Sequence, residues 1–527
     1  MGGQDFAGAI ALLEPLTAED PDNARAWYLL GSALHGAGRF EDALGALEMA
    51  ADFSAVEAQA SYNAACACAG LNDPEGAFEW LGRAMEAGFQ NLSLLMSDTD
   101  LAGLRKDPRF NELLPIGVPA TFVEDVRVHY VIDGENQGDR FGWIGRNAGD
   151  VNKDGIADLL ISAPFHGPGK NSGRIYVYSG KDGKELFRCD GKPGELLGIG
   201  IESAGDIDGD ARADQLAGAS GAAGGTGAAY IYSGADGRLM RSFEGEAVGD
   251  SFGRKVAGAG DQDGDGVPDV IIGAAGHDAN GTDAGRAYVY SGKTGKALIT
   301  LDGPGPGARF GSCVDAHAGA DGRLLIIGAQ DAGSNNEGKV YVYRVTDGKA
   351  ELAFTIHGQK GDVNLGRMFV SAIGDVNGDG VTDVYASDWE SNAGTQGAGR
   401  IYIHSGADGE RLYALAGEKA GDGFGIGTCE AGDVDGDGCD DFLVGAWQND
   451  AGAVGGGRCY LYSGRTGEIL NTYTCSTYGD TFGFDTTGLG DIDGDGALDF
   501  LITSADSYVS GPQSGRIFVV SGPARAK

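Results

Sequence analysis

Six short segments of the chain carry acidic residues at a spacing that suits a bound calcium ion. Five have the full pattern Asp-x-Asp/Asn-x-Asp-Gly-x-x-Asp, which puts side-chain oxygens at positions 1, 3, 5 and 9. Calcium takes about six to eight oxygen ligands at about 2.3–2.6 Å, whereas magnesium keeps more water and demands strict octahedral geometry. Glycine at position 6 permits the sharp bend, and the carbonyl group of position 7 adds a ligand. We therefore expect Ca2+ in these five loops. Their ligands are Asp150, Asn152, Asp154 and Asp158; Asp261, Asp263, Asp265 and Asp269; Asp375, Asn377, Asp379 and Asp383; Asp433, Asp435, Asp437 and Asp441; and Asp491, Asp493, Asp495 and Asp499.

The sixth segment departs from the pattern. Its ligand positions are Asp206, Asp208, Asp210 and Asp214. Ala211 stands where the other loops have glycine, and Arg212 adds a positive charge beside the site. A Cβ atom at a position of positive φ costs about 1–2 kcal/mol, so we expect weaker calcium binding here. Ordinary Asp-Gly hairpin turns without an ion are the competing interpretation of all six segments, and the recurrence in phase with a longer repeat disfavours it.

The Asp loops belong to a unit that occurs seven times between about Thr121 and Gly522. Each unit has a Phe-Gly pair (Leu-Gly in two units), the Asp loop, a short apolar strand, a turn of small residues and an alternating strand before a tight hairpin turn. The fourth unit lacks the Asp loop. The alternating strand recurs at Gly173–Gly180, Gly227–Gly234, Gly285–Gly292, Gly399–Gly406, Gly457–Gly464 and Gly515–Gly522, with a degenerate copy at Gly338–Arg344. Four strands per unit, repeated radially, predict a seven-bladed β-propeller.

The order of strands predicts how the ring closes. The last unit ends after its third strand at Gly522, whereas a strand at Val126–Ile132 precedes the first Phe-Gly pair and has no unit before it. We expect this N-terminal strand to complete the last blade. An open β-solenoid is the alternative architecture.

The first 115 residues are different in kind, being rich in Ala and Leu at helical periodicity. The chain matches itself at a shift of 34 residues, with Trp27, Leu30, Gly31, Ala43 and Leu47 at signature positions. A helix–turn–helix period of this length resembles the tetratricopeptide repeat family. Small residues at fixed positions let paired helices approach closely, so a short helical solenoid is expected.

The whole chain is therefore expected to be multidomain, α followed by all-β. We place helical repeats in residues 1–115, a linker in 116–120, the propeller in 121–522 and a tail in 523–527. Phe6–Leu16 reads as the second helix of a repeat whose first helix is absent, which suggests a longer parent or a trimmed start. Leu101–Leu114 reads as a capping helix, and Cys66 and Cys68 as core residues.

The Phe-Gly pair, the Asp loop and the small-residue turn Ser162-Ala163-Pro164 resemble the FG-GAP repeats of integrin α subunits. The resemblance covers residues 121–522. It implies a seven-bladed propeller with calcium in several loops, and adhesion or protein–protein recognition on the face opposite those loops. The chain departs from that family in having six candidate loops, in lacking the loop of the fourth unit, and in the Leu-Gly pairs Leu197-Gly198 and Leu365-Gly366.

Composition excludes several classes of partner. The net charge of −38 disfavours nucleic acid and anionic membrane surfaces. No apolar run is long enough to span a bilayer, and Met1–Ala11 shows no signal peptide. Calcium loops nevertheless suit an extracellular, periplasmic or cell-surface location. A disulfide is possible among the crowded Cys429, Cys439, Cys459 and Cys475.

These features predict a non-catalytic binding module with a protein or glycan partner. Candidate ligand residues lie in the loops after the small-residue turns: Trp389, Trp447, Phe165 and Tyr508. The two tryptophans could instead fill gaps between blades. A lectin-like propeller is the first alternative function and a polysaccharide-active enzyme the second. No catalytic residue is assigned, because the histidines are scattered, no Gly-x-Ser-x-Gly elbow occurs, and calcium geometry accounts for the aspartates.

Overall fold

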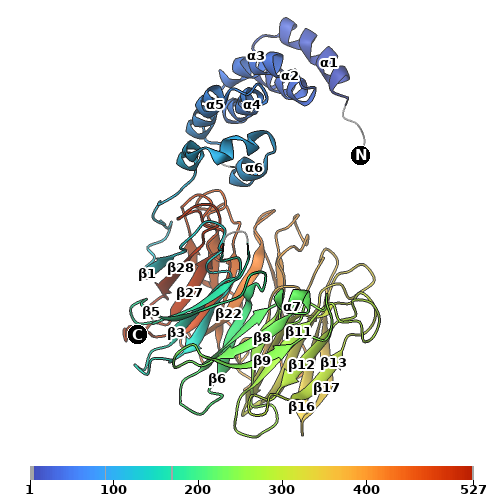
Figure 1. The fold of residues 1–527 in the computed structure, drawn as a ribbon, viewed down its shortest axis with the longest axis vertical. Coiled ribbons are helices and arrows are strands. Elements are labelled where there is room, and N and C mark those ends of the chain that lie inside the picture. Colours follow the sequence, from blue (N-terminus) through green and yellow to red (C-terminus); the bar gives the residue numbers. More distant parts are fainter. Residues whose placement is uncertain (1–4, 90, 168–169, 525–527) are drawn as a thin grey trace. The chain divides into compact units, whose positions relative to one another are not determined.

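The computed structural model describes residues 5–89, 91–167 and 170–524 (Figure 1). The chain divides into two compact units, Met1–Ile116 and Gly117–Lys527. The first unit is helical and the second is built from strands, so the predicted order of an α domain and an all-β domain is confirmed.

The helical unit stacks consecutive antiparallel helices. They are α1 (Phe6–Glu19), α2 (Ala24–Gly36), α3 (Phe40–Ala51), α4 (Glu57–Gly70), α5 (Pro74–Glu86) and α6 (Leu92–Ser97). Each of the first four packs on the next, and α5 also contacts the 3₁₀ turn Pro108–Leu113. Close approach depends on small residues: Gly31 of α2 lies so near Leu47 of α3 that a Cβ atom there would collide with the leucine side chain. Cys66 and Cys68 are buried, as predicted.

The prediction of a single capping helix over Leu101–Leu114 is wrong. That segment forms short 3₁₀ turns, η1 (Asp100–Ala102), η2 (Leu104–Lys106) and η3 (Pro108–Leu113). A residue before proline disfavours the α conformation, and Asp107 is indeed extended, with φ −84° and ψ 130°. The turns still bury Leu101, Leu104 and Phe110, so they cap the helical core without continuing it.

The strands described in the second unit form seven antiparallel sheets of four strands each, which confirms the seven-bladed propeller. The blades in chain order are β2 (Gly145–Gly149), β3 (Asp158–Ala163), β4 (Arg174–Tyr178) and β5 (Glu185–Asp190); β6 (Leu197–Gly205), β7 (Asp214–Ala219), β8 (Ala228–Tyr232) and β9 (Leu239–Glu244); β10 (Val256–Gly260), β11 (Asp269–Ala274), β12 (Arg286–Tyr290) and β13 (Ala297–Asp302); β14 (Phe310–Gly319), β15 (Gly322–Ala329), β16 (Lys339–Thr346) and β17 (Lys349–His357); β18 (Val370–Ala372), β19 (Val384–Asp388), β20 (Arg400–His404) and β21 (Arg411–Ala416); β22 (Phe424–Gly432), β23 (Asp441–Ala446), β24 (Arg458–Tyr462) and β25 (Ile469–Thr474); and β26 (Thr486–Gly490), β27 (Asp499–Ser504), β28 (Arg516–Ser521) and β1 (Val128–Asp133). A short helix, α7 (Ala222–Gly225), lies between β7 and β8.

The ring closes through the N-terminal strand, as predicted. Strand β1 pairs antiparallel with β28, so strands from the two ends of the unit share the last blade (Figure 1). The innermost strands of neighbouring blades contact one another around the ring, including β26 of the last blade and β2 of the first. An open β-solenoid is thereby excluded.

The Phe-Gly pairs join neighbouring blades. Phe141 is 2% exposed and bridges to Gly515 of the preceding blade, and the same bridge recurs at Phe252, Phe310 and Phe482. The glycine of the pair has positive φ, 77° at Gly253, where a Cβ atom would collide with the carbonyl group of Ala228. The pair therefore lets two backbones approach at each joint, and leucine replaces phenylalanine at Leu197 and Leu365 without loss of the bridge.

The fourth blade replaces its missing Asp loop with a tight hairpin. Strands β14 and β15 pair to Gly319 and Gly322, so only two residues connect them. His317 Nε2 lies 2.8 Å from Asp321 Oδ1, and Asp321 Oδ2 accepts a hydrogen bond of 2.9 Å from the Thr382 amide of the next blade. The side chains of His317 and Asp321 thus stabilise the connection between the first and second strands of this blade, as a calcium ion is expected to do in the other blades.

All eight cysteines are free thiols, so the disulfide considered among Cys429, Cys439, Cys459 and Cys475 is absent. Cys439, Cys459 and Cys475 are buried, and the Cys475 thiol lies 3.6 Å from the carboxylate of Asp480. These residues serve as small core side chains.

Candidate calcium loops and ligand face

The Asp loops connect the first and second strands of their blades and share one hydrogen-bond scheme. In the third blade, Asp261 Oδ1 accepts from the amides of Gly264 at 2.6 Å and Asp265 at 3.1 Å, and its Oδ2 accepts from Gly266 at 2.9 Å. Asp263 and Asp265 each accept from an amide two residues on. The side chains at positions 1, 3 and 5 therefore fold the loop around themselves.

The folded loops gather oxygen ligands within reach of one ion. In four loops, three carboxylates have oxygens within 4.8 Å of one another: Asp206, Asp208 and Asp210; Asp261, Asp263 and Asp265; Asp433, Asp435 and Asp441; and Asp491, Asp493 and Asp499. The first and fifth blades have the same turn with Asn152 and Asn377 at position 3. Oxygen-only ligand sets of this kind fit calcium.

The aspartate at position 9 is buried and ties the loop to the sheet. Asp269 Oδ2 accepts from the Gln262 amide at 2.8 Å and its Oδ1 accepts from the Gly292 amide at 3.0 Å. Burial raises the pKa of Asp269 to about 6, and nearby Asp263 adds to the shift. The same causes raise the pKa of Asp383 to about 7. A cation among these carboxylates would relieve their repulsion, which is further evidence that the loops fit a metal ion.

The loop of the last blade already faces Arg127, just before β1, and His129 within β1. Arg127 forms ion pairs with Asp493 and Asp495, and His129 Nε2 lies 2.9 Å from Asp499 Oδ1. The Arg465 guanidinium lies 3.0 Å from Asp437 in the sixth blade. The acidic charge is thus partly balanced at these two loops.

The candidate ligand loops lie at the other end of the same strands, because they connect the second and third strands. Aromatic rings from four consecutive blades touch in sequence there. The centroid distances are 6.2 Å from Trp389 to Trp447, 5.5 Å from Trp447 to Phe484, 5.1 Å from Phe484 to Trp143 and 5.8 Å from Trp143 to Phe165. We call these five residues the aromatic arc.

Four of the five rings of the arc are half-buried, and an arginine side chain lies against two of them. Trp143, Phe165, Trp389 and Trp447 are half-buried, and Phe484 is buried. The Arg140 guanidinium lies 5.4 Å from the ring centroids of both Trp143 and Phe165 and is paired with Asp506 at 2.9 Å. The structure thus brings Trp389, Trp447 and Phe165 together. Tyr508 is not one of these rings: within the described residues it makes no ring contact, although it lies near Arg140, and burial together with Asp506 raises its pKa to about 12.

Comparison with known proteins agrees with this geometry. The FG-GAP repeat model matches residues 141–178 and 252–290, and an FG-GAP-like repeat model matches residues 375–444. The propeller therefore contains FG-GAP repeats. A tetratricopeptide repeat model matches residues 1–56, which confirms the nature of the helical unit.

The FG-GAP propeller is similar to integrin α subunits. Integrin alpha-5 of Xenopus laevis is 33% identical over 186 residues, covering 32% of this chain and 18% of the relative. Integrin alpha-7 of Rattus norvegicus is 34% identical over 155 residues, 27% of this chain and 13% of the relative. Integrin alpha-PS5 of Drosophila melanogaster is 32% identical over 172 residues, 30% of this chain and 17% of the relative. The chain therefore matches less than a fifth of the length of each of these proteins.

Among the described residues, no helix combines the length and apolarity needed to cross a membrane.

Two features of the FG-GAP propeller escaped the sequence analysis. Position 4 of the Asp loops has positive φ, 82° at Gly264 and 64° at Lys153, and glycine stands there in five of the six loops. The residue after each Phe-Gly pair supplies Trp143 and Phe484 of the aromatic arc. The recurring glycine was the available signal for the first feature, and a variable residue at a fixed place in an otherwise constant repeat was the signal for the second.

Replacing Ala211 with glycine should stabilise the second blade. Ala211 has φ 64°, which confirms the positive φ expected at position 6. Relief of about 1–2 kcal/mol of backbone strain outweighs the entropy that glycine adds to the unfolded chain, about 0.5–1 kcal/mol. We expect Ala211→Gly to raise stability by about 0.5–1 kcal/mol in thermal or urea unfolding.

The control is Ala235→Gly in the hairpin turn of the same blade, where φ is not positive. It should lower stability slightly. Equal effects of the two changes would contradict the assigned role of backbone strain at Ala211.

Proposed function

We propose that this chain is a calcium-stabilised, non-catalytic binding module that engages a protein partner through the propeller face bearing the aromatic arc. The helical repeats offer a second surface of the kind that binds peptides. An extracellular, periplasmic or cell-surface setting would supply the calcium. The similarity to integrin α subunits supports a role in adhesion, and it covers only the propeller.

The aromatic arc is the observation that carries this proposal. Four blades contribute to it, so it is a property of the assembled ring and not of one repeat. Half-exposed aromatic side chains beside an arginine are the residue types enriched at the centre of protein interfaces. Trp389 and Trp447 also pack against the core that the fifth and sixth blades share, so they fill the gap between these blades as well.

Calcium has a separate, structural role in the proposal. Each loop ends in a buried aspartate whose carboxylate accepts a hydrogen bond from a backbone amide near the start of its own loop. In five blades it also accepts one from the amide of the glycine that follows the third strand. An ion held by positions 1, 3, 5 and 9 therefore fixes the first three strands of its blade together. In this proposal the aspartates serve the ions and the sheet, and none acts as an acid or base.

The packing of Trp447 predicts different stability effects for two substitutions. The indole N–H of Trp447 is buried without a hydrogen-bond partner, which costs about 1–3 kcal/mol. Trp447→Phe keeps a ring and removes that group, so stability should be unchanged or slightly higher. Trp447→Ala removes the contacts with Trp389 and Phe484 and should lower the free energy of unfolding by about 3 kcal/mol.

Binding is measured with peptides selected from a phage-displayed random library on the full chain in calcium. Peptides that use this face should lose affinity for Trp143→Ala while keeping it for Ile469→Ala, a control at an exposed residue of β25. The same chain is applied to a glycan array. Binding to neutral glycans, with no peptide enriched, would replace the protein partner by a carbohydrate.

A further inference from the structure

The residue that follows each Phe-Gly pair lies near the start of an innermost strand, directly before the residues that line the central cavity. We call this end of the central cavity the mouth of the channel. Each innermost strand starts there and runs toward the Asp loop, so residues at equal distance from the pair form rings around the axis. The first ring is Trp143, Ile199, Arg254, Ser312, Arg367, Ile426 and Phe484. The first, second, sixth and seventh blades supply its apolar residues, whereas the third and fifth blades supply two arginines.

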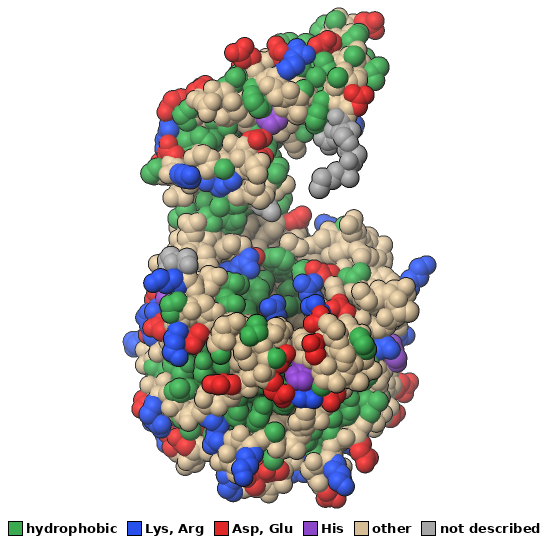
Figure 2. All heavy atoms as spheres, turned by 45° about the vertical axis from the view of Figure 1, so that its right-hand side comes forward, with side chains coloured by type: hydrophobic (Ala, Val, Ile, Leu, Met, Phe, Trp, Pro, Cys, Tyr) green, Lys and Arg blue, Asp and Glu red, His purple; other side chains and the backbone are tan. Residues whose placement is uncertain are grey.

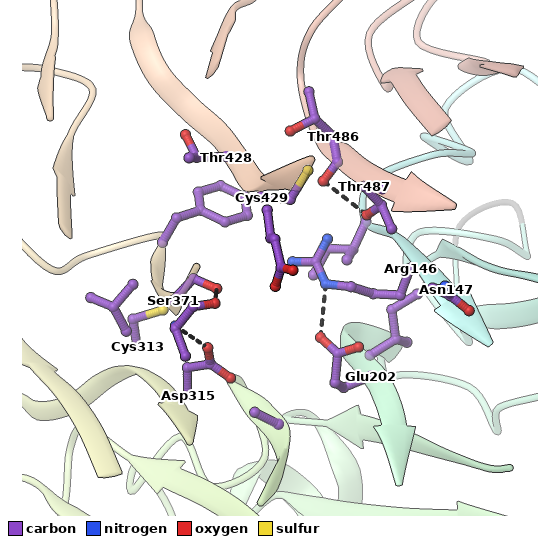
Figure 3. Close-up of a pocket in the computed structure, with 18 of the residues that line it drawn as sticks. Arg146, Asn147, Glu202, Cys313, Asp315, Ser371, Thr428, Cys429, Thr486 and Thr487 are labelled. Carbon is purple, nitrogen blue, oxygen red and sulfur yellow. Dashed lines mark hydrogen bonds and ion pairs between the residues drawn. The ribbon is translucent and has the colours of Figure 1, made fainter. Parts of the chain in front are cut away.

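Below the mouth lies a cavity of about 470 Å3 lined by residues from all seven blades. Figure 3 shows the Arg146 guanidinium extending into it and facing Glu202, with Asp315 and Cys313 across the space. In the propeller, Figure 2 shows a hollow with apolar side chains inside and Lys or Arg side chains at its edge. The cavity holds one or two side chains, not a folded segment.

The charges deeper in the cavity are balanced within the protein. Arg146 lies 2.9 Å from Glu202 and 2.5 Å from Asp485, both from neighbouring blades. Asp315 accepts a hydrogen bond of 2.8 Å from the Ala372 amide. Arg146, Glu202 and Asp315 stand four residues after their Phe-Gly pairs, two residues beyond Lys255, so they lie about 7 Å further from the mouth.

Of the described cations near the mouth, Arg254 and Lys255 are not balanced in this way, whereas Arg367 is. Lys255 is 9% exposed, and its Nζ lies 4.9 Å from the ring centroid of Phe369. Within the described ranges 5–89, 91–167 and 170–524, no carboxylate forms an ion pair with Lys255 or with Arg254. Arg367 is paired with Glu390 at 2.6 Å. We call Arg254, Lys255 and Arg367 the basic rim.

The basic rim is electrostatically unfavourable as it stands. Burial, with Arg254 and Arg146 nearby, lowers the pKa of Lys255, while Cys313 and Asp485 act in the opposite direction. The surrounding protein and the Arg367 charge lower the pKa of the exposed Arg254 guanidinium. Like charges gathered at a partly desolvated site are stabilised by an anion placed between them.

The net charge of −38 limits what that anion can be. A polyanion such as nucleic acid or a sulfated polysaccharide would be repelled by the rest of the surface, whereas a single carboxylate responds mainly to the charges nearest to it. The narrow cavity also suits one side chain better than a polymer lying across the face.

We propose that the protein partner inserts an Asp or Glu side chain into the channel mouth, where Arg254 and Lys255 bind its carboxylate. This rests on the proposed function, since it names the group by which the partner of the same face is recognised. The aromatic arc then packs around the residues that flank the acidic one.

The test uses the peptides selected on the full chain in calcium. The bound peptides should share an acidic residue, and its change to Asn or Gln should lower affinity about tenfold or more, as expected for a charge-assisted hydrogen bond. Arg254→Gln and Lys255→Gln should each cause a similar loss, and combining either with the neutral peptide should add little. Arg254 is exposed, so Arg254→Gln tests the proposal even if Lys255→Gln does not fold.

The matched control is Arg238→Gln, which removes the same charge from an exposed position in the hairpin between β8 and β9. It should leave peptide affinity unchanged. One result would overturn this inference and leave the proposed function standing. Peptide affinity would then fall in Trp143→Ala but would change neither when the acidic residue of the peptide is replaced nor in Arg254→Gln. Failure to select any peptide would count against the proposed function itself. Heparin binding that is lost in Arg254→Gln would replace the acidic side chain by a sulfated polysaccharide.

Discussion

Removing calcium with a chelator should lower the unfolding temperature of the propeller by on the order of 10 °C. At a calcium concentration about 100 times the dissociation constant, each occupied loop stabilises the folded state by about 2.7 kcal/mol. Five full loops share one ring in which every blade contacts its neighbours. With an unfolding entropy of about 2.1 cal/mol/K per residue, each kcal/mol shifts the midpoint by about 1 °C in a unit of this size. Differential scanning calorimetry of the full chain with and without EGTA measures the shift.

The helical unit provides the internal control for that measurement. It has none of the Asp loops, so the unfolding transition of the helical unit, followed by the loss of helical ellipticity, should not depend on calcium. Restoring calcium should restore the propeller transition, and magnesium at the same concentration should restore less of it. A propeller transition that does not respond to EGTA would mean that the Asp loops fold as turns without ions.

Replacing Asp269 with alanine should destabilise the propeller whether or not calcium is present. The substitution removes a metal ligand and leaves the buried amides of Gln262 and Gly292 without acceptors. Each unsatisfied amide costs about 1–3 kcal/mol, so we expect a loss of about 2–6 kcal/mol in EGTA and more in calcium. Urea unfolding followed by intrinsic fluorescence gives both values.

Asp263→Ala in the same loop is the matched comparison. Asp263 is exposed and accepts only from the Asp265 amide, so its loss should matter in calcium and hardly at all in EGTA. Equal losses of stability for the two variants in EGTA would contradict the separation of a metal ligand from a buried structural carboxylate.

Much of the fold followed from repetition in the sequence. The Phe-Gly pairs, the Asp loops and the Ser-Gly strands each mark one place in a blade, so their order predicted the four strands and the closure through β1. The helical repeats were predicted by the spacing of Trp27, Ala43 and Leu47. The segment from Leu101 to Leu114 was not, because Pro108 and the residue before it break a helix that composition alone favours.

The ligand face was only partly predictable. Trp389, Trp447 and Phe165 stood out because they interrupt loops of small residues. Trp143, Phe484 and Lys255 did not, because each looks like an ordinary strand residue until the ring brings equivalent positions of different blades to one axis. Pairings such as Arg146 with Glu202 and Asp485 join three blades, and no local pattern encodes them.

The most direct test of the account is the number of calcium ions that the full chain binds. Equilibrium dialysis against calcium, with the protein-bound metal counted by atomic emission, should give five or six ions per chain. Five corresponds to the full loops alone, and six adds the loop of Ala211. A value of one or none at millimolar calcium would contradict the claim that divalent ions hold the blades' loops together.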